Sequence, residues 1–299
     1  MTAHALGSLE ARLARGETAT REDVASLCRG QDLVSIGVIG DLVRQACTGT
    51  RVTYGRVLSC EGDVPDAIGQ AGEVRLVGTP ASIDDARRRV RAAVARAGGR
   101  VVTGFSLADL VSLAGDDRDR LRGVAADLAQ DGLVAVAEVA IDRAISDAAA
   151  IAQVQAVRAG GLETWRLTID DAEGLDVRMA LIERARAVQE ATGAVRAFAP
   201  LPRRDPRGTP STGYDDVKTV AAARVRCPDI EVIQIDWPLY GPKLAQVALT
   251  FGAGDLDGIS PYDTSDLGPR RAPVEDIHRQ IRAAGGEPVE RDATYRPRG

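Results

Sequence analysis

The chain has 299 residues, and 44% of them are hydrophobic, which is enough for the core of one large domain or two modest ones. No apolar run reaches the roughly 18 residues of a membrane span, and the charged N-terminal segment lacks the apolar block of a signal peptide. The formal net charge is −5, with arginine and acidic residues interspersed. These features predict a cytoplasmic protein that binds neither nucleic acid nor membranes.

The first 50 residues are predicted to form a helical extension. Leu9 and Leu13 have helical spacing, and Thr20 with Asp23 three residues later has the spacing of a capping box. A third apolar helical segment ends at Gly49. No strand pattern precedes residue 51.

Strand and helix patterns alternate from residue 51 to residue 262. Eight strand segments are expected, at 51–60, 72–78, 100–106, 132–142, 163–169, 194–202, 231–237 and 255–260. This alternation predicts an α/β fold, a (β/α) TIM-type barrel, followed by a C-terminal extension over 263–299 that packs on the barrel. A doubly wound sheet is the alternative, disfavoured because no GxGxxG follows the first strand.

The first barrel unit is expected to be reduced. Only 12 residues, 61–72, separate the first two strand segments, which is too short for a normal crossover helix. A missing helix would leave that flank of the barrel apolar. We expect the N-terminal helices, through Leu9, Leu13 and Val24, or another subunit, to cover it.

Cysteine and histidine usage argues against metal sites and imidazole catalysis. The four cysteines, Cys28, Cys47, Cys60 and Cys227, form no CxxC or CxxxCxxC group, whereas cluster and zinc sites usually draw their ligands from one short loop. The two histidines lie near the N-terminus and in a late helix. We therefore expect no metal and no cofactor.

Polar side chains on the apolar strand segments are the candidate site residues. Glu138 and Asp236 are candidate catalytic carboxylates, because a lone acid on an apolar strand is costly unless it is paired or functional. Arg166, Thr168 and Gln234 are candidate ligand contacts on the interior faces of their strands. The alternative is structural, with Arg166 paired to Glu138 or Asp236.

Two further groups follow strand ends, where barrels bind their ligands. Arg203 and Arg204 follow the sixth strand segment and offer planar forks for a carboxylate or phosphate; the alternative is a solvated loop. Asp257, in the eighth segment, is a further candidate contact, or it caps the local turn.

Four segments resemble a known enzyme family. They are VTYGRV at 52–57, TGYDDVKTVAAARV at 212–225, IQIDWPLYGPKLAQVALTFGAGDLDG at 233–258 and IRAAGGEPVERDATY at 281–295. They resemble aminofutalosine synthase and dehypoxanthine futalosine cyclase, radical S-adenosylmethionine barrel enzymes of the futalosine route to menaquinone. The resemblance implies a radical-enzyme barrel and a carboxylated, nucleoside-like substrate.

The chain departs from that family where the radical chemistry resides. The family's three-cysteine cluster loop should follow 52–57, but here the chain reads LSCEGDVPDAIG, and Cys60 stands alone. Three thiolates are needed to hold three irons of a cluster whose fourth iron binds the cofactor. The loop at 198–210 also lacks the family's histidine.

These features predict a homologue without a cluster that binds a small anionic or nucleoside-like molecule. The alternatives are a non-radical lyase, isomerase or hydrolase that uses a barrel carboxylate, and a pseudoenzyme partner of a radical paralogue. A homo-oligomer is a further possible assembly. The residues leave open whether the chain is an enzyme.

Overall fold

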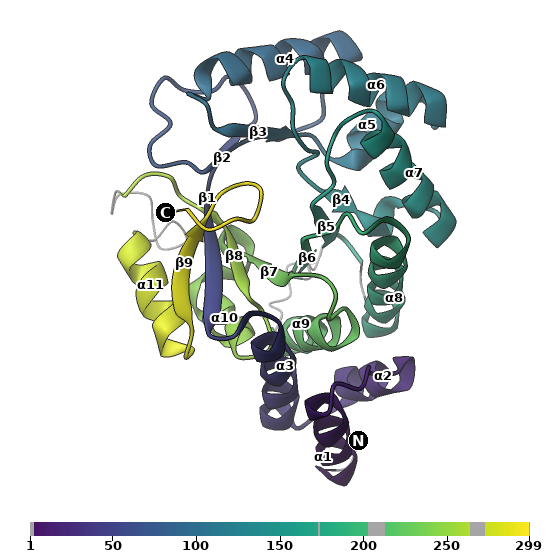
Figure 1. Cartoon of the computed structure of the whole chain (residues 1–299), viewed down its shortest axis with the longest axis vertical. Helices are drawn as coiled ribbons and strands as arrows, with labels where there is room; N and C mark the ends of the chain where they lie inside the picture. Colours follow the sequence, from purple (N-terminus) through teal and green to yellow (C-terminus); the bar gives the residue numbers. More distant parts are fainter. Residues whose placement is uncertain (1–2, 173, 203–212, 264–272, 299) are drawn as a thin grey trace.

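The computed structural model describes residues 3–172, 174–202, 213–263 and 273–298 of the chain (Figure 1). The strands are β1 (Arg51–Cys60), β2 (Glu73–Leu76), β3 (Val101–Gly104), β4 (Val139–Ala140), β5 (Arg166–Ile169), β6 (Ala197–Pro200), β7 (Val232–Asp236), β8 (Asp255–Ile259) and β9 (Glu287–Arg291). The helices are α1 (Ala3–Ala14), α2 (Arg21–Arg29), α3 (Leu33–Thr48), α4 (Ile83–Arg96), α5 (Leu107–Ala114), α6 (Arg118–Gln130), the 3-10 helix η1 (Ile141–Arg143), α7 (Asp147–Ala159), α8 (Leu175–Thr192), α9 (Tyr214–Arg226), α10 (Trp237–Leu249) and α11 (Val274–Ala283).

The strands form a TIM-type barrel, as the alternation of patterns predicted. Their order is β3-β2-β1-β8-β7-β6-β5-β4, and neighbouring strands are parallel. Single bridges, Thr103 with Ala135 and Ser106 with Glu138, join the segment before β4 to the region of β3. The sheet therefore curls around an interior, with helices outside it (Figure 1). Seven of the predicted strand segments contain regular strands of four or more residues.

The predicted strand over 132–142 is only partly regular. Only Val139 and Ala140 form a ladder with β5. The ladder toward β3 is disturbed because the Ala137 amide lies against two successive carbonyl oxygens, those of Gly104 and Phe105, at 3.3 and 2.9 Å. Such a two-against-one pairing interrupts a strand and re-aims the side chains beside it.

The short link after β1 contains no helix, so the first barrel unit is reduced as predicted. The link covers its own flank, because it buries Val64 and Ala71. It is tied to the next helix by Arg96, which donates to the Val64 carbonyl at 2.7 Å.

The N-terminal helices do not cover that flank, and the expectation that they would is wrong. Thr20 and Asp23 form the predicted capping box of α2. The buried Val24 belongs to this helix, but α2 packs on α8 and α9, and α3 packs on α9. Gly40 of α3 lies so close to the Phe251 carbonyl group that a Cβ there would overlap it. These close contacts fix the extension on the far side of the barrel from β2 (Figure 1).

The C-terminal segment contains a strand that the sequence analysis missed. β9 pairs in parallel with residues 51–55 of β1, while β2 pairs with residues 57–60 of the same strand. The chain after β9 then enters the barrel. There Tyr295 packs in an apolar cluster with Ala135, Trp165, Ala197 and Val232.

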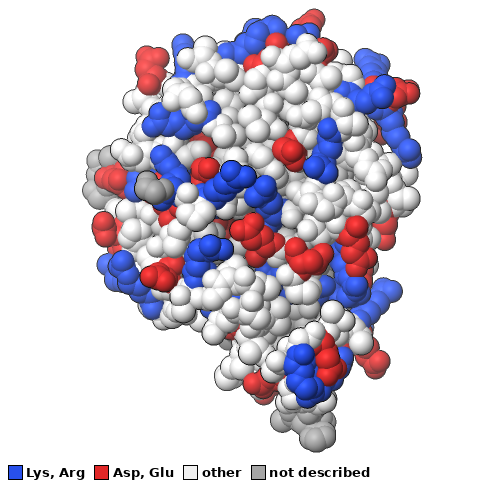
Figure 2. All heavy atoms as spheres, in the orientation of Figure 1, with Lys and Arg blue, Asp and Glu red and all other residues white. Residues whose placement is uncertain are grey.

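The described face of the molecule carries mixed charge, with arginine and acidic side chains interspersed over the view in Figure 2. Within the described ranges, no helix combines the length and apolar character needed to cross a membrane. The absence of nucleic-acid binding stays a prediction.

Ion pairs fill the barrel interior around Asp257. This carboxylate accepts from Arg75 Nη1 at 2.7 Å and from Arg291 Nη2 at 2.9 Å, and all three side chains are buried. Glu73 also binds Arg75, at 2.7 Å, and Asp255 binds Arg291, at 2.6 Å. Burial opposes ionisation of Asp257, but the charges of Arg75, Arg166 and Arg291 outweigh it and hold its pKa far below the ordinary value.

Replacing Asp257 tests this network. Asp257→Asn should lower the free energy of unfolding at neutral pH by about 3–5 kcal/mol, because it removes the buried carboxylate that bridges Arg75 and Arg291 and leaves each with a single acidic partner. Since the folded-state pKa is depressed, the wild-type carboxylate stabilises the fold above its unfolded pKa of about 3.9, and this contribution is lost as the pH falls. The variant should therefore lose less stability between about pH 5 and pH 3.

Urea unfolding at several pH values measures both effects. Asp119→Asn is the matched control, because the Asp119 side chain is 90% exposed and pairs only with its helical neighbour Arg122 among the described residues. An Asp257→Asn protein as stable as this control, with an unchanged acid slope, would contradict the role of the network.

Candidate functional site

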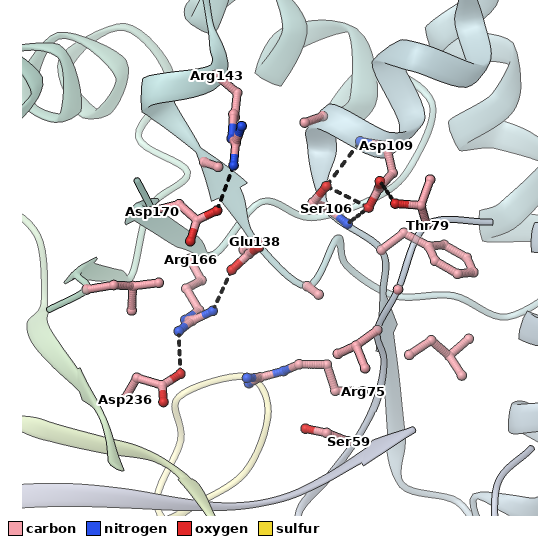
Figure 3. A pocket seen from close by; sticks show the side chains of 18 of the residues that line it. Ser59, Arg75, Thr79, Ser106, Asp109, Glu138, Arg143, Arg166, Asp170 and Asp236 are labelled. Atoms are coloured by element: carbon pink, nitrogen blue, oxygen red, sulfur yellow. Dashed lines mark hydrogen bonds and ion pairs between the residues drawn. The ribbon is translucent and has the colours of Figure 1, made fainter. Parts of the chain in front are cut away.

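A cavity of about 560 Å³ opens at the carboxyl ends of the strands, where barrel enzymes bind their ligands (Figure 3). Its polar lining comes from strands β1, β2, β5 and β7 or the residues just after them, from the start of α5 and from the residues around β4. The polar lining residues are Ser59, Arg75, Thr79, Ser106, Asp109, Glu138, Arg143, Arg166, Asp170 and Asp236. This volume is within the range of small-molecule sites.

Arg166 of β5 lies at the centre of the predicted site residues. Its Nη1 donates to Glu138 Oε2 at 3.0 Å and its Nη2 to Asp236 Oδ2 at 3.3 Å (Figure 3). Its Nε donates to Gln234 Oε1 at 2.6 Å. Burial disfavours the charged form of Arg166, but Asp257 and the other acids outweigh burial and raise its pKa. The structural alternative for Arg166 is therefore present: every nitrogen of its guanidinium has a partner.

The two candidate catalytic carboxylates come together in space. Glu138 and Asp236 flank Arg166 and line the cavity, with side chains 28% and 17% exposed. Asp236 also caps α10 by accepting from the Leu239 amide at 3.1 Å. Burial raises the pKa of Asp236, Arg166 opposes the rise and Asp257 adds to it. A carboxylate with a raised pKa in a cavity is suited to proton transfer.

Three of the predicted ligand contacts are fully buried and do not line the cavity. Gln234 Nε2 donates to Asp255 Oδ1 at 2.8 Å and lies 3.0 Å from the Tyr295 hydroxyl, which orients its carbonyl oxygen toward Arg166. Thr168 Oγ1 has no hydrogen-bond partner among the described residues. Asp257 is held by the interior arginines. The role of Gln234, Thr168 and Asp257 in ligand binding stays a prediction. Because these residues do not line the cavity, they would act by orienting residues that do.

The two remaining predicted contacts, Arg203 and Arg204, lie outside the described residues. Their role also stays a prediction.

The cavity includes residues that the sequence analysis missed. Arg75 of β2 lies between two apolar residues and two positions after Glu73, and this pair of charges on one strand face was visible in the sequence. Arg143 pairs with Asp170 and Asp171, at 3.2 and 2.5 Å. These pairings depend on which strand ends are neighbours, which the sequence does not state.

The turn from β3 into α5 adds a strained residue to the wall. Phe105 has φ of 57°, a left-handed conformation that costs energy for a bulky side chain, and Ser106 and Asp109 after it form a capping box. Its ring packs under Arg89, whose Cζ lies 5.0 Å from the ring centre. The capping-box spacing, Ser106 with Asp109 three residues later, was readable in the sequence; the backbone strain was not.

The described residues do not fit the three-thiolate cluster that the family resemblance implies. Cys60 ends β1 but is buried, burial raises the pKa of its thiol, and its neighbour Ser59 lines the cavity instead. Cys28 and Cys47 lie in α2 and α3, and Cys227 ends α9. No three His, Cys, Asp or Glu side chains of the described ranges are grouped so that they would hold a metal ion.

Known proteins are similar in sequence to part of this chain. No family model matches. The chain is 34% identical over 155 residues to the 5-amino-6-(D-ribitylamino)uracil–L-tyrosine 4-hydroxyphenyl transferase of Methanothermobacter thermautotrophicus, covering 46% of this chain and 42% of the relative. It is 31% identical over 139 residues to the aminodeoxyfutalosine synthase of Streptomyces coelicolor, covering 40% of this chain and 36% of the relative. The chain thus spans less than half the length of these curated relatives.

Solved structures share the fold over nearly the whole chain. Methylornithine synthase superposes with a TM-score of 0.68 at 15% identity, over 94% of this chain and 97% of that one. The [FeFe]-hydrogenase maturase HydG superposes with a TM-score of 0.64 at 12% identity, over 99% of this chain and 77% of that one. The chain therefore shares the TIM-type barrel fold of methylornithine synthase and HydG, and part of its sequence resembles the aminodeoxyfutalosine synthases and the ribitylaminouracil–tyrosine transferases.

Proposed function

We propose that this chain binds a nucleoside-like small molecule at the carboxyl end of its barrel and does so without radical chemistry. The observation that carries the proposal is the pairing inside the cavity. Arg75 and Arg166 are buried and bound to acidic side chains, whereas Glu138 and Asp236 remain partly exposed to the cavity. Arg143 is about half exposed and pairs with Asp170 and Asp171.

Ionised carboxylates accept hydrogen bonds, so exposed acids select ligands that donate them. Ribose and ribityl hydroxyl groups and exocyclic amino groups are such donors. The name of one relative supports this class, because ribitylaminouracil joins a base to a polyol. The serine and threonine hydroxyls of the lining, from Ser59, Thr79 and Ser106, add acceptors and donors around the same space.

The nucleoside-like ligand is favoured over the purely anionic one that the sequence also allowed. An acidic ligand group at Arg166 would lie beside Glu138 and Asp236, which already pair with this arginine and would repel a further negative charge. Arg203 and Arg204 remain candidates for an acidic part of the ligand, from outside the described residues.

Radical chemistry is left out of the proposed function because the single buried thiol of Cys60 cannot replace three converging thiolates. Cys60 supplies the only cysteine near the position that the resemblance assigns to the cluster, and the cavity wall there is Ser59.

Proton-transfer chemistry is the second candidate function. The raised pKa of Asp236 and its place in the cavity favour a lyase, isomerase or hydrolase in which this carboxylate acts as general base or acid. A partnership with a radical paralogue, or with a second copy, stays a prediction without a specific contact to support it.

Calorimetric titration with adenosine and with 5-amino-6-(D-ribitylamino)uracil tests ligand binding. Glu138→Gln should weaken the affinity by about 10-fold to 100-fold, because it replaces a charge-assisted hydrogen bond with a neutral one. Glu163→Gln is the matched control, since Glu163 lies before β5 at the opposite end of the barrel. If neither compound binds, or if the two variants bind alike, the proposal is wrong.

Anaerobic reconstitution with iron and sulfide tests the absence of radical machinery. We expect the protein to bind far less than the roughly four irons of one cluster, and Cys60→Ala should leave the bound iron unchanged. Stoichiometric iron that is lost in Cys60→Ala would show a cluster at this position.

A further inference from the structure

A second cavity lies beside the first, on the outer side of the barrel wall between α5 and α7. Its volume is about 530 Å³. The wall is mostly apolar, formed by Leu107, Val111, Val139, Ile141 and Ile145. Ile145 is 94% exposed, so its side chain is free to contact a molecule bound in this cavity. We refer to this cavity as the α5–α7 groove.

The α5–α7 groove adjoins the polar cavity. Three residues, Ala108, Ala140 and Arg143, line both spaces. Two of these are alanines, whose methyl groups occupy little of the space between the two cavities. The third is an arginine whose side chain is about half exposed and held aside by Asp170 and Asp171. The partition between the two cavities therefore contains no large apolar side chain.

We infer that the natural ligand has two parts, a hydroxylated head in the polar cavity and an apolar tail in the α5–α7 groove. This inference rests on the proposed function, because the head is the nucleoside-like group that Glu138 and Asp236 are proposed to bind. The tail passes Ala108 and Ala140 and packs against Val111 and Ile145.

The dimensions and composition of the groove favour a small-molecule tail. Its volume is that of a drug-sized site, and it shares lining residues with a polar cavity of almost the same size. Ser112, Asp116, Arg118 and Gln153 also line the groove, so the tail meets groups that donate and groups that accept hydrogen bonds beside the apolar wall.

Two series of tailed nucleosides test the inference. Adenosine carrying alkyl tails of increasing length at the 5′ position, or at N6, is titrated against the protein by calorimetry. In at least one series the affinity should rise by about twofold to fourfold per methylene group until the groove is filled. Ser112→Trp, which places an indole in the groove from an exposed position, should abolish this rise and leave adenosine itself unaffected.

Ala148→Trp is the matched control, because Ala148 is exposed on α7 but does not line the groove. It should keep the rise with tail length. If adenosine binds but the affinity of its tailed derivatives does not grow with tail length in either series, the groove assignment is wrong and the proposed function still stands. No binding by adenosine or any derivative would contradict both. A dimer in sedimentation that Ser112→Trp alone dissociates would assign the groove to a second copy and overturn the inference.

Discussion

The ionised carboxylate of Asp257, buried between Arg75 and Arg291 and 3.9 Å from Arg166, is the interaction on which the rest of the barrel depends. It joins β8 to β2, to β9 and to β5 across the interior. Removal of one partner from such a buried ion pair strongly lowers the stability of the fold. The arginines that hold it are therefore structural, and the ends of the strands that carry them are fixed relative to one another.

Because the buried arginines are already paired with acidic side chains, the cavity favours ligands that donate hydrogen bonds to its carboxylates. Arg166 directs three of its five N–H donors to Gln234, Glu138 and Asp236, and the two carboxylates remain partly exposed to the cavity. Gln234 is itself oriented by Asp255 and Tyr295, and the C-terminal segment thus sets the geometry of the cavity from inside the barrel. The carboxyl end of this barrel is thus a polar cavity lined by paired arginines and carboxylates, with the buried thiol of Cys60 next to its lining residue Ser59.

The sequence predicts much of this fold, because periodicity and caps act locally. The 51–60 strand, the capping box at Thr20 and the missing helix at 61–72 are all readable from residue patterns. The irregular strand before β4 and the strand β9 are not, since the first depends on the backbone of Phe105 and the second on pairing with a distant strand. For the site, the strand pattern marks Glu138, Arg166 and Asp236 as unusual residues. It does not choose between pairing and ligand binding, because that depends on which strand ends become neighbours.

A crystal structure of the protein with adenosine monophosphate tests the central claim most directly, because this ligand offers both ribose hydroxyls and a phosphate. The account predicts hydroxyl oxygens within about 2.6–3.2 Å of the Glu138 or Asp236 carboxylate, with the bond from Arg166 to Gln234 preserved. A phosphate bound to Arg166 or Arg75, with Glu138 or Asp236 displaced, would contradict it.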